Sequence, residues 1–426
     1  MSIAIVSSTM DNAVRKKINK ELPIKIENNK YNPNAPPQWI IPFLDDGETT
    51  VIPFSYGARV LKIPRPLRKR FTETRLKFEG SLRDEQLVVR NETADIISKK
   101  GSVMISAYCG FGKSILAVNL AVAIGFSTLI IVHTVPLMRQ WERSILDFCP
   151  SARVVRVTTK SVYKPADFYI INAQNAKKKG RDFFKNVGLV VVDEAHKIMA
   201  ATLSQALQYV QPRYLIGLSA TPYRPDGLDK LLTLYFGSHP KIIRKLWKEH
   251  TAYIVRTGII PKLEKTITGK LNWNVVLDSV SMNHDRNELI IKIIMSHLTR
   301  TFMVLTKRVA QGDYLEARLK ASGVSVTSLM RSKQEFDVTA QVLIGTVGKI
   351  GTGFDHQALD ALILASDVQE YFIQFLGRCM RRVDVVPIVF DLVDNHRTLE
   401  KHYDTRKGVY LEHGGTIVNF NRNKLI

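Results

Sequence analysis

The sequence predicts an α/β protein with two parallel-sheet domains and a small β-rich region ahead of them. The first observation is a series of short apolar runs separated by helical stretches, the pattern of a parallel sheet covered on both faces. The second is that this series occurs twice, before and after about residue 245. The third is the seven prolines between Tyr31 and Pro66, which bound short strands and forbid long helices.

The chain of 426 residues has room for two or three domains, each with its own core. We expect an N-terminal accessory region at 1–79, α/β domains at 80–245 and 246–400, and a basic tail at 401–426. Right-handed crossovers place the carboxyl ends of a sheet's strands along one crevice. The first domain's strands are expected at Ser102–Ala107, Thr128–Val132, Phe168–Ile171, Val187–Val192 and Tyr214–Leu218. Those of the second are expected at Ala252–Arg256, Thr301–Leu305, Val324–Leu329, Val342–Thr346, Ala361–Leu364 and Val386–Leu392.

The charge of the chain indicates a polyanionic partner. The formal net charge is +22 and the isoelectric point is about 9.8, whereas the hydrophobic content of 45% is ordinary. Charge alone does not separate DNA from RNA, or either from an anionic membrane. A basic cluster in the N-terminal region fits a phosphate-backbone contact and, equally, a solvated linker. It comprises Arg59, Lys62, Arg65, Arg68, Lys69, Arg70, Arg75 and Lys77.

The cysteines and the chain start favour a soluble intracellular protein with free thiols. Cys109, Cys149 and Cys379 are too widely spaced for a zinc site or a disulfide framework. The first residues lack the apolar core and cleavage site of a secretory leader, and no run of 18 apolar residues occurs.

A loop suited to a triphosphate follows the first predicted strand. Ile105–Leu116 reads ISAYCGFGKSIL, in which glycines let backbone N–H groups face phosphate oxygens and the next helix adds its positive end. Lys113 can reach the outer phosphates, and the Ser114 hydroxyl can bind Mg²⁺. The usual opening glycine is replaced, so the motif alone also fits a glycine-rich turn before an ordinary helix. The loop comprises Ala107, Tyr108, Cys109, Gly110, Phe111, Gly112, Lys113 and Ser114.

Two adjacent carboxylates end another apolar strand, within the sequence LVVVDEAH at Leu189–His196. We expect Asp193 to hold Mg²⁺ and Glu194 to polarise the attacking water as a general base. An accidental Asp-Glu pair at this point is improbable, because the phosphate loop lies about 80 residues upstream, in the order that a nucleotide-binding sheet requires.

Other groups are expected around this centre. The sequence LSATPYR at 218–224 ends a strand in Ser219 and Thr221, which can hydrogen-bond His196 and couple nucleotide state to domain closure. The side-chain amide of Gln86 can pair with the edge of an adenine, although a glutamine at a helix start is the plainer interpretation.

Loops after further strands carry groups suited to phosphates. Thr134 and Arg139 follow the second strand, where a nucleic-acid backbone would cross the strand ends. In the second domain, IGTVGKIGTGFD at 344–355 includes Thr346, and Asp355 can meet a ribose hydroxyl.

An arginine-rich segment of the second domain, QFLGRCMR at 374–381, is predicted to be helical. Gln374, Arg378 and Arg381 would then share one helix face. Arginines delivered from a second domain neutralise charge growing on a γ-phosphoryl group. The alternative for such a helix is a solvated basic face.

Taken together, GFGKS, VVDEAH, LSATPYR, the loop ending TGFD and QFLGRCMR resemble the motifs of superfamily 2 helicases of the DEAH-box type. The resemblance covers about residues 80–395. LRDEQ at 82–86, the pair Gln140 and Trp141, and TPYRPDGLDKL resemble excision-repair and phage recombination helicases. VRTGIIP and GTVGKIGTGFD are most similar to the transcript-release helicase of poxviruses and other large cytoplasmic DNA viruses.

The resemblance implies two RecA-like domains that share ATP and Mg²⁺, with nucleic acid across their outer face. It implies a monomeric motor that works with transcription or replication machinery, in transcript release, recombination or repair. For a viral chain it implies the host cytoplasm and allows packaging in the virion. By motif match, ATP chemistry falls to Gln86, the 107–114 loop, Asp193, Glu194, His196, Arg378 and Arg381, and strand contact to Thr134, Arg139 and Thr346.

Two departures from the family pattern, Ala107 and Phe111, remove no catalytic group, although Phe111 puts the flexibility of the loop in doubt. The sequence shows no dedicated strand-separating hairpin, so ATPase activity is expected more firmly than unwinding. A DNA-directed helicase is favoured. An RNA-directed helicase stays open, as does a nucleic-acid-binding scaffold with a non-hydrolysing ATP clamp, which the intact Lys113, Glu194 and Arg381 disfavour.

Overall fold

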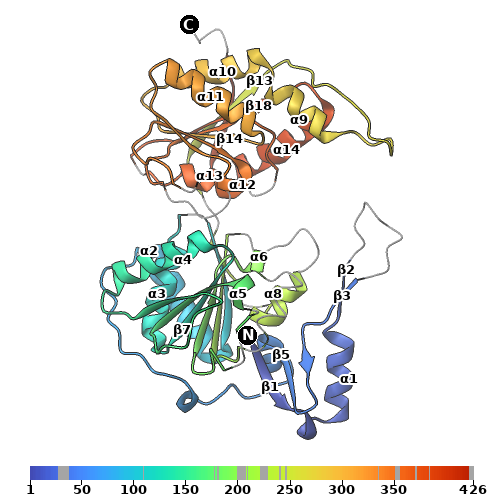
Figure 1. Ribbon diagram of the computed structural model, residues 1–426, viewed down its shortest axis with the longest axis vertical. Helices are drawn as coiled ribbons and strands as arrows, with labels where there is room; N and C mark the ends of the chain where they lie inside the picture. Colours follow the sequence, from blue (N-terminus) through green and yellow to red (C-terminus); the bar gives the residue numbers. More distant parts are fainter. Residues whose placement is uncertain are drawn as a thin grey trace. The chain divides into compact units, whose positions relative to one another are not determined.

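The computed structural model describes residues 1–26, 38–108, 110–176, 178–179, 182–198, 208, 210–220, 229–238, 241–244, 247–333, 335–350, 356–369, 372–382 and 384–421. The chain divides into two compact units, Met1–Arg244 and Lys245–Ile426, and each is described by itself. Each contains a seven-stranded parallel sheet, which confirms the predicted fold class (Figure 1). Within the ranges given above, the structure has no helix with the length and apolar character needed to cross a bilayer.

The sheet of the first unit is entirely parallel, with the strand order β12–β6–β11–β10–β7–β9–β8. The central strands are buried at every position because structure covers both faces, and this explains why they are continuous apolar runs. The strands are β6 Ser102–Ala107, β7 Thr128–Val132, β8 Val154–Val157, β9 Phe168–Asn172, β10 Leu189–Val192, β11 Tyr214–Ser219 and β12 Lys241–Arg244.

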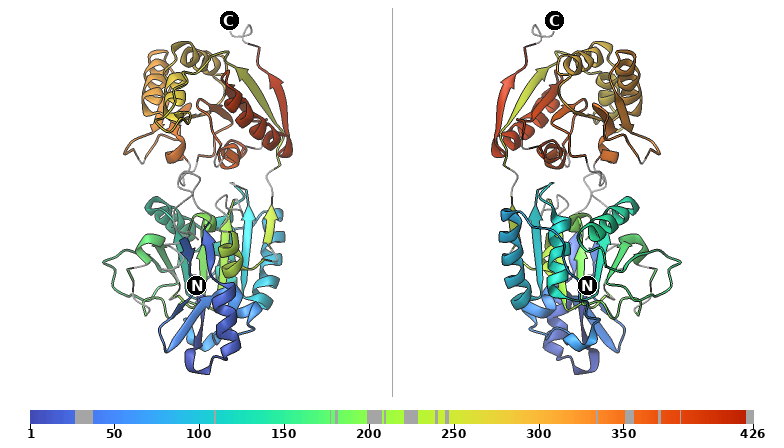
Figure 2. Two further views of the ribbon diagram at one scale, coloured as in Figure 1. Left: turned by 90° about the vertical axis from the view of Figure 1, so that its right-hand side faces the viewer. Right: turned by 90° about the vertical axis from the view of Figure 1, so that its left-hand side faces the viewer.

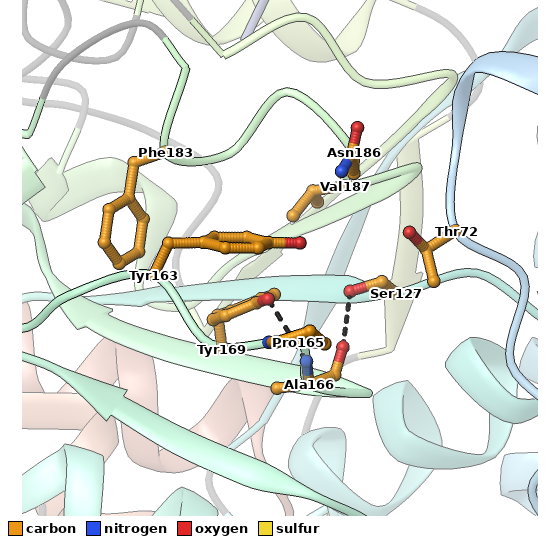
Figure 3. Close-up of a pocket in the computed structure, with 9 residues that line it drawn as sticks. All are labelled: Thr72, Ser127, Tyr163, Pro165, Ala166, Tyr169, Phe183, Asn186 and Val187. Carbon is orange, nitrogen blue, oxygen red and sulfur yellow. Dashed lines mark hydrogen bonds between the residues drawn. The ribbon is translucent and has the colours of Figure 1, made fainter.

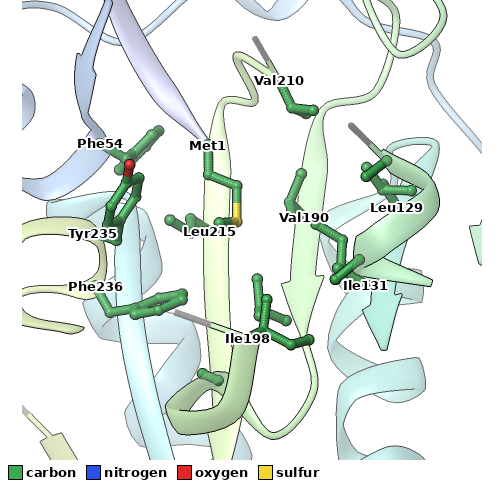
Figure 4. Packing of buried hydrophobic residues seen from close by; sticks show 14 of the residues in the cluster. Met1, Phe54, Leu129, Ile131, Val190, Ile198, Val210, Leu215, Tyr235 and Phe236 are labelled. Carbon is green, nitrogen blue, oxygen red and sulfur yellow. The ribbon is translucent and has the colours of Figure 1, made fainter. Parts of the chain in front are cut away.

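Successive side chains of these strands enter two separate cores, one on each face of the sheet. Val191 packs in the core formed with α2, α3 and α4, whereas Val190 packs in the core formed with α8 and the N-terminal region. Figure 4 shows Met1 of the N-terminal region beside Leu215 of β11 in this second core. The helices are α2 Asp84–Lys100, α3 Lys113–Ile124, α4 Val135–Phe148 and α8 Asp229–Phe236.

The described part of the N-terminal region contains a three-stranded antiparallel sheet in the order β1–β5–β4, the α-helix α1, and a two-stranded ribbon of β2 and β3. The Ser2 N–H donates to the Val210 carbonyl at 2.9 Å and so joins β1 to the segment before β11. The region therefore belongs to the first compact unit. The elements are β1 Ser2–Val6, α1 Asn12–Glu21, β2 Ile24–Ile26, β3 Gln38–Ile40, β4 Leu44–Asp45 and β5 Thr49–Pro53.

Residues 61–79 form a strap along the amino ends of the first unit's parallel strands. The Thr72 N–H donates to the Asn186 carbonyl at 3.0 Å, and the Thr72 carbonyl accepts from the Ser127 N–H at 2.8 Å. Asn186 precedes β10 and Ser127 precedes β7, so the strap crosses the edge opposite the carboxyl ends.

Several arginines of the predicted basic cluster fix this strap to the fold. Arg65 donates to the carbonyls of Ile97 at 3.2 Å and Ser98 at 3.0 Å, which end α2. The Arg68 guanidinium lies 4.6 Å from the ring centroid of Phe126. These contacts are structural, so the cluster is neither a simple solvated linker nor wholly available to phosphates.

The second unit also has a parallel sheet, in the order β15–β16–β14–β17–β18–β13–β19, with helices on both faces (Figure 2). The strands are β13 His250–Arg256, β14 Phe302–Thr306, β15 Val326–Leu329, β16 Val342–Thr346, β17 Ala361–Leu364, β18 Ile388–Val393 and β19 Gly415–Asn419. The helices are α9 Trp273–Ser281, α10 His284–Met295, α11 Val309–Ala321, α12 Val347–Ile350, α13 Phe372–Cys379 and α14 Arg397–Glu412.

The residues expected to form a basic tail after 400 are instead part of the second unit. They complete α14 and form β19, which pairs in parallel with β13. Arg406 of α14 is buried and donates from Nε and Nη2 to the two carboxylate oxygens of Asp391, each at 2.8 Å. The interpretation as a tail was wrong because the sequence does not show which charged residues are paired. Arg406 is buried against a strand aspartate, but in the sequence it cannot be told from a surface arginine.

Candidate active site

The predicted phosphate loop joins β6 to α3 through two glycines in the left-handed region. Gly110 has φ +91° and Gly112 has φ +83°, and a Cβ at Gly112 would lie 2.4 Å from Gln86 Nε2. Only glycine fits the second position without displacing that neighbour. Ala107 and Phe111, the two residues that depart from the family pattern, are fully buried and belong to the core of the first unit. Phe111 packs edge-on against Tyr108 with ring centroids 5.4 Å apart, so it anchors the loop.

Lys113 opens α3, and its ammonium group lies against the loop itself. Nζ donates to the Ala107 carbonyl at 2.7 Å and to the Tyr108 carbonyl at 3.1 Å. Its positive charge favours the ionised forms of both Asp193 and Glu194, so the ammonium group lies within electrostatic reach of the two carboxylates. Ser114, the next residue of α3, is partly buried, and Cys109 lies outside the described residues.

Gln86 is buried and ties the start of α2 to the phosphate loop. Its Oε1 accepts from the Arg83 N–H at 2.9 Å, and its Nε2 donates to the Phe111 carbonyl at 2.8 Å. Nε2 can still donate one more hydrogen bond and Oε1 can still accept one, and an adenine edge needs one of each. The predicted adenine contact is therefore compatible with a role in fixing the loop.

Asp193 lies at the carboxyl end of β10 with both oxygens held. Trp141 Nε1 donates to Oδ2 at 2.8 Å, and the Glu194 N–H donates to Oδ1 at 3.0 Å. Burial, followed by the charge of Glu194, raises the pKa of Asp193 to about 6, although the bond from Trp141 and the charge of Lys113 oppose the rise. Each oxygen retains a free lone pair toward a metal ion.

Glu194 has φ +47°, in the region that residues with side chains rarely adopt. Burial favours its neutral form, but the charges of Lys113 and neighbouring bases outweigh burial and lower the pKa of Glu194. Its Oε2 lies 3.4 Å from His196 Nδ1. A strained backbone at an ionised, partly buried carboxylate is typical of a functional site.

His196 connects the carboxylates to the next strand. Its Nδ1 is 2.8 Å from the Ser219 hydroxyl at the end of β11, so the predicted hydrogen bond between these two side chains is confirmed. Thr221, the second expected partner, lies outside the described residues.

The end of β7 places a further group at this edge. His133 follows β7, and burial lowers its pKa to about 4, with the charge of Lys197 acting in the same direction. Within the described residues neither ring nitrogen of His133 has a hydrogen-bond partner. Thr134, the predicted strand contact, caps α4 without a side-chain hydrogen bond, and Arg139 of α4 is exposed. No sequence pattern pointed to His133, because its partial burial depends on tertiary packing.

The predicted residues of the second unit occupy different settings. Thr346 ends β16, while Gln374 and Arg378 are buried on α13. Arg381 lies two residues beyond the end of α13, so the expected shared helix face does not extend to it. Asp355 lies outside the described residues.

A small pocket lies at the opposite edge of the first sheet, among segments that precede β7, β9 and β10 (Figure 3). The Ser127 hydroxyl donates to the Ala166 carbonyl there at 2.9 Å. This pocket is separate from the carboxyl edge that carries Lys113, Asp193 and Glu194.

The groups at the carboxyl edge fit a nucleoside triphosphate with Mg²⁺. A glycine turn at a helix start can hold phosphates, Lys113 supplies charge, and Ser114 with Asp193 supplies oxygen ligands of the kind that Mg²⁺ prefers. The partly buried, ionised Glu194 can polarise a water beside them.

Comparison with known proteins gives related results. Residues 79–224 match the family model described as "Type III restriction enzyme, res subunit". The chain is 43% identical over 447 residues to "Putative helicase 161L" of Invertebrate iridescent virus 6, covering 99% of this chain and 100% of that protein. It is 33% identical over 382 residues to "Putative helicase 055L" of Frog virus 3 (isolate Goorha), covering 88% and 87%.

Among solved structures, the chain is similar in fold to S. cerevisiae Dbp5 bound to RNA and ADP BeF3. The TM-score is 0.56 at 11% sequence identity, and the match covers 80% of this chain and 94% of that chain. At this identity the likeness concerns the fold alone.

Proposed function

Because this chain belongs to the superfamily 2 helicases, we propose that it is a motor that moves along DNA and separates its strands. As a member of this family it is an ATP-dependent enzyme that uses Mg²⁺. The observation that carries the proposal is the carboxylate pair at the end of β10, in which Asp193 is buried and Glu194 partly buried, within reach of the charge of Lys113.

In the proposed reaction, Lys113 and the N–H groups of the glycine loop hold the phosphates, and Ser114 with Asp193 holds Mg²⁺. When bound, MgATP supplies the phosphoryl group whose transfer to water releases free energy. Glu194 orients and polarises that water, and its ionised state at neutral pH suits this role. The His196 bond to Ser219 links the same carboxylate to the end of β11, a route by which the nucleotide state can reach the neighbouring loop.

We assign the second unit a complementary role. Arg378 and Arg381 would neutralise charge on the γ-phosphoryl group, with Gln374 alongside, when the units close on the nucleotide. An arginine delivered in this way contributes roughly 10³–10⁵ in rate. Loss of those contacts on hydrolysis would let the units part, so that closure becomes stepping.

The proposed track lies across the carboxyl edges of the sheets, where Thr134, Arg139 and Thr346 would contact phosphates. Contacts of this kind tolerate any sequence and weaken with salt. DNA is proposed on the motifs shared with excision-repair and phage recombination helicases. Transcript release is the pathway we favour, with recombination and repair as alternatives.

The substitution Glu194→Gln tests the site. We expect ATP hydrolysis to fall by at least about 100-fold while nucleotide binding persists, because the water loses its polarising carboxylate. The control is Glu79→Gln, the same substitution at an exposed glutamate of the strap, which should leave the rate of ATP hydrolysis unchanged. A fully active Glu194→Gln enzyme would contradict the assignment.

Strand displacement on matched DNA, RNA and hybrid duplexes tests the substrate. We expect single-stranded DNA to stimulate phosphate release and DNA duplexes to be separated with ATP. Faster separation of RNA or hybrid duplexes would make the chain an RNA-directed helicase. A wild type that binds nucleic acid and ATP without releasing phosphate would be a clamp, and the motor proposal would fail.

A further inference from the structure

A hairpin of exposed residues projects from the second unit between β13 and α9 (Figure 1). We call residues 258–272 the prong. Every residue from Lys262 to Lys270 is exposed, although the segment directly follows a strand of the sheet. The relative exposure of Ile267 at its tip is 109%, so this side chain has no packing role in the fold.

The prong has internal hydrogen bonds that define its tip. The Thr266 N–H donates to the Lys270 carbonyl at 2.7 Å, and the Gly269 N–H donates to the Thr266 carbonyl at 2.8 Å. Gly269 has φ +77°, which this turn requires. Lys265 and Leu271 form an antiparallel bridge below the turn. Ile267 is therefore presented at a built turn.

The base of the prong is attached to the sheet and to α9. The Asn395 N–H, which follows β18, donates to the Ile259 carbonyl at 2.8 Å. The Lys262 N–H donates to the Ser279 hydroxyl of α9 at 2.9 Å. Because β13 and β18 are parallel neighbours, the prong emerges at the carboxyl edge of the sheet, the same edge from which the loops after β14 and β16 leave.

The prong combines apolar and basic side chains. Ile260 is 72% and Leu263 is 55% exposed, in addition to the isoleucine at the tip. Lys262 and Lys265 flank Leu263, and in the described part of the chain neither ammonium group has an ion-pair partner. A projecting element that carries apolar and basic side chains together suits a partner that offers both apolar surface and negative charge.

We infer that the prong engages the junction between paired and unpaired strands of a nucleic acid. Ile267 would press against the terminal base pair, and Lys262 and Lys265 would hold the flanking phosphates. Aliphatic side chains are known to wedge between stacked bases, and lysines bind the backbone without reading sequence. This inference rests on the proposed motor function and supplies the strand-separating element that the sequence did not reveal.

An apolar patch on a partner protein would also cover Ile267. The charges favour nucleic acid, because Lys262–Lys270 contains three lysines and one acidic residue, Glu264. The excess of lysine suits phosphates on both sides of the tip, and the net charge of the whole chain has the same sign.

The substitution Ile267→Ser tests the wedge. We expect the number of base pairs separated per ATP hydrolysed to fall roughly tenfold, because a serine cannot replace the apolar contact with the terminal bases. Phosphate release stimulated by single strands should stay within about twofold of wild type, because single strands present no junction. The matched control is Val386→Ser, which changes an exposed valine ahead of β18, at the amino edge.

The double substitution Lys262→Ala/Lys265→Ala tests the phosphate contacts. We measure the affinity for a forked duplex at several salt concentrations. The slope of log affinity against log salt should fall by the equivalent of about two phosphate contacts, whereas the slope for a single strand should change little. Lys292→Ala/Lys407→Ala, on α10 and α14, removes the same charge elsewhere in the unit. Unfolding curves of all variants should superimpose on the wild type, because the altered side chains are exposed.

Three results would overturn the inference. The first is normal strand separation by Ile267→Ser, which is what a protein-docking prong predicts. The second is a parallel loss of single-strand-stimulated hydrolysis and separation, which would place Ile267 in the motor itself. The third is a wild type that hydrolyses ATP on single strands but separates none. If nucleic acid does not stimulate ATP hydrolysis by the wild type, the proposed function itself is refuted.

Discussion

Trp141 Nε1 donates a 2.8 Å hydrogen bond to Asp193 Oδ2, and both residues are buried. The indole comes from α4, whereas the carboxylate ends β10. Since the other oxygen of Asp193 accepts from the Glu194 N–H, the plane of the carboxylate is set by two donors. The orientation of the proposed Mg²⁺ ligand therefore depends on a tryptophan outside the loops that carry the motifs.

Trp141→Phe should weaken Mg²⁺ binding while keeping most of the aromatic packing. We expect the Mg²⁺ concentration that half-saturates fluorescent nucleotide binding to rise by at least about tenfold, the usual effect of removing a bond to a metal ligand. Ile145→Ala is the control, because Ile145 lies one turn further along α4 and is equally buried. It should lower stability without altering the Mg²⁺ requirement. Equal Mg²⁺ titrations for Trp141→Phe and wild type would refute the positioning role.

Arg65→Ala should destabilise the first unit without changing how the chain binds nucleic acid. The substitution removes two hydrogen bonds to carbonyls at the end of α2 and a guanidinium 5.2 Å from the Tyr214 ring centroid. We expect the free energy of unfolding to fall by about 1–3 kcal/mol. Denaturant unfolding measures this, and Lys62→Ala in the same strap is the exposed control. Unchanged stability with weaker nucleic-acid binding would instead restore the phosphate-contact interpretation.

His133 should make the first unit less stable as the pH falls from about 6.5 to about 4. The folded-state pKa of His133 is about 4, below the ordinary histidine pKa of 6.5, so in this window the unfolded chain binds a proton that the folded chain excludes. The effect is absent above pH 6.5 and complete below pH 4. Its slope is at most about 1.4 kcal/mol per pH unit.

His133→Asn should remove that part of the pH dependence. Urea unfolding of wild type and variant at several pH values measures the difference in slope. Parallel curves between pH 6.5 and 4 would mean that His133 titrates normally in the folded chain.

The central strands could be predicted from the sequence, but three edge strands could not. β7 and β10 are apolar throughout because they pair on both sides and are covered on both faces. β8 and β12 are the two edges of the first sheet, and β19 is an edge of the second. An edge strand pairs on one side only, so a short segment suffices. Charged residues occur in β8 and β12, and glycine and asparagine bound β19, so none of the three gives a long apolar signal.

The phosphate loop and the carboxylate pair were also predictable, because each lies in a contiguous motif next to a strand end. The bond from Trp141 to Asp193 was not, since it joins residues 52 positions apart through the packing of α4 on the sheet. The arginines of the strap misled for a related reason. The partners of Arg65 are backbone carbonyls and that of Arg68 is a phenylalanine ring distant in the chain, and neither contact leaves a trace in the sequence.

The pairing of β19 with β13 bears on how the chain is made on the ribosome. Until Asn419 has left the exit tunnel, β13 has a vacant side that another nascent chain could occupy. The sheet of the second unit is therefore complete only after nearly all residues of the unit have been synthesised. A chain truncated near residue 400 keeps every motif but lacks β19. We expect it to aggregate, because one side of β13 stays unpaired.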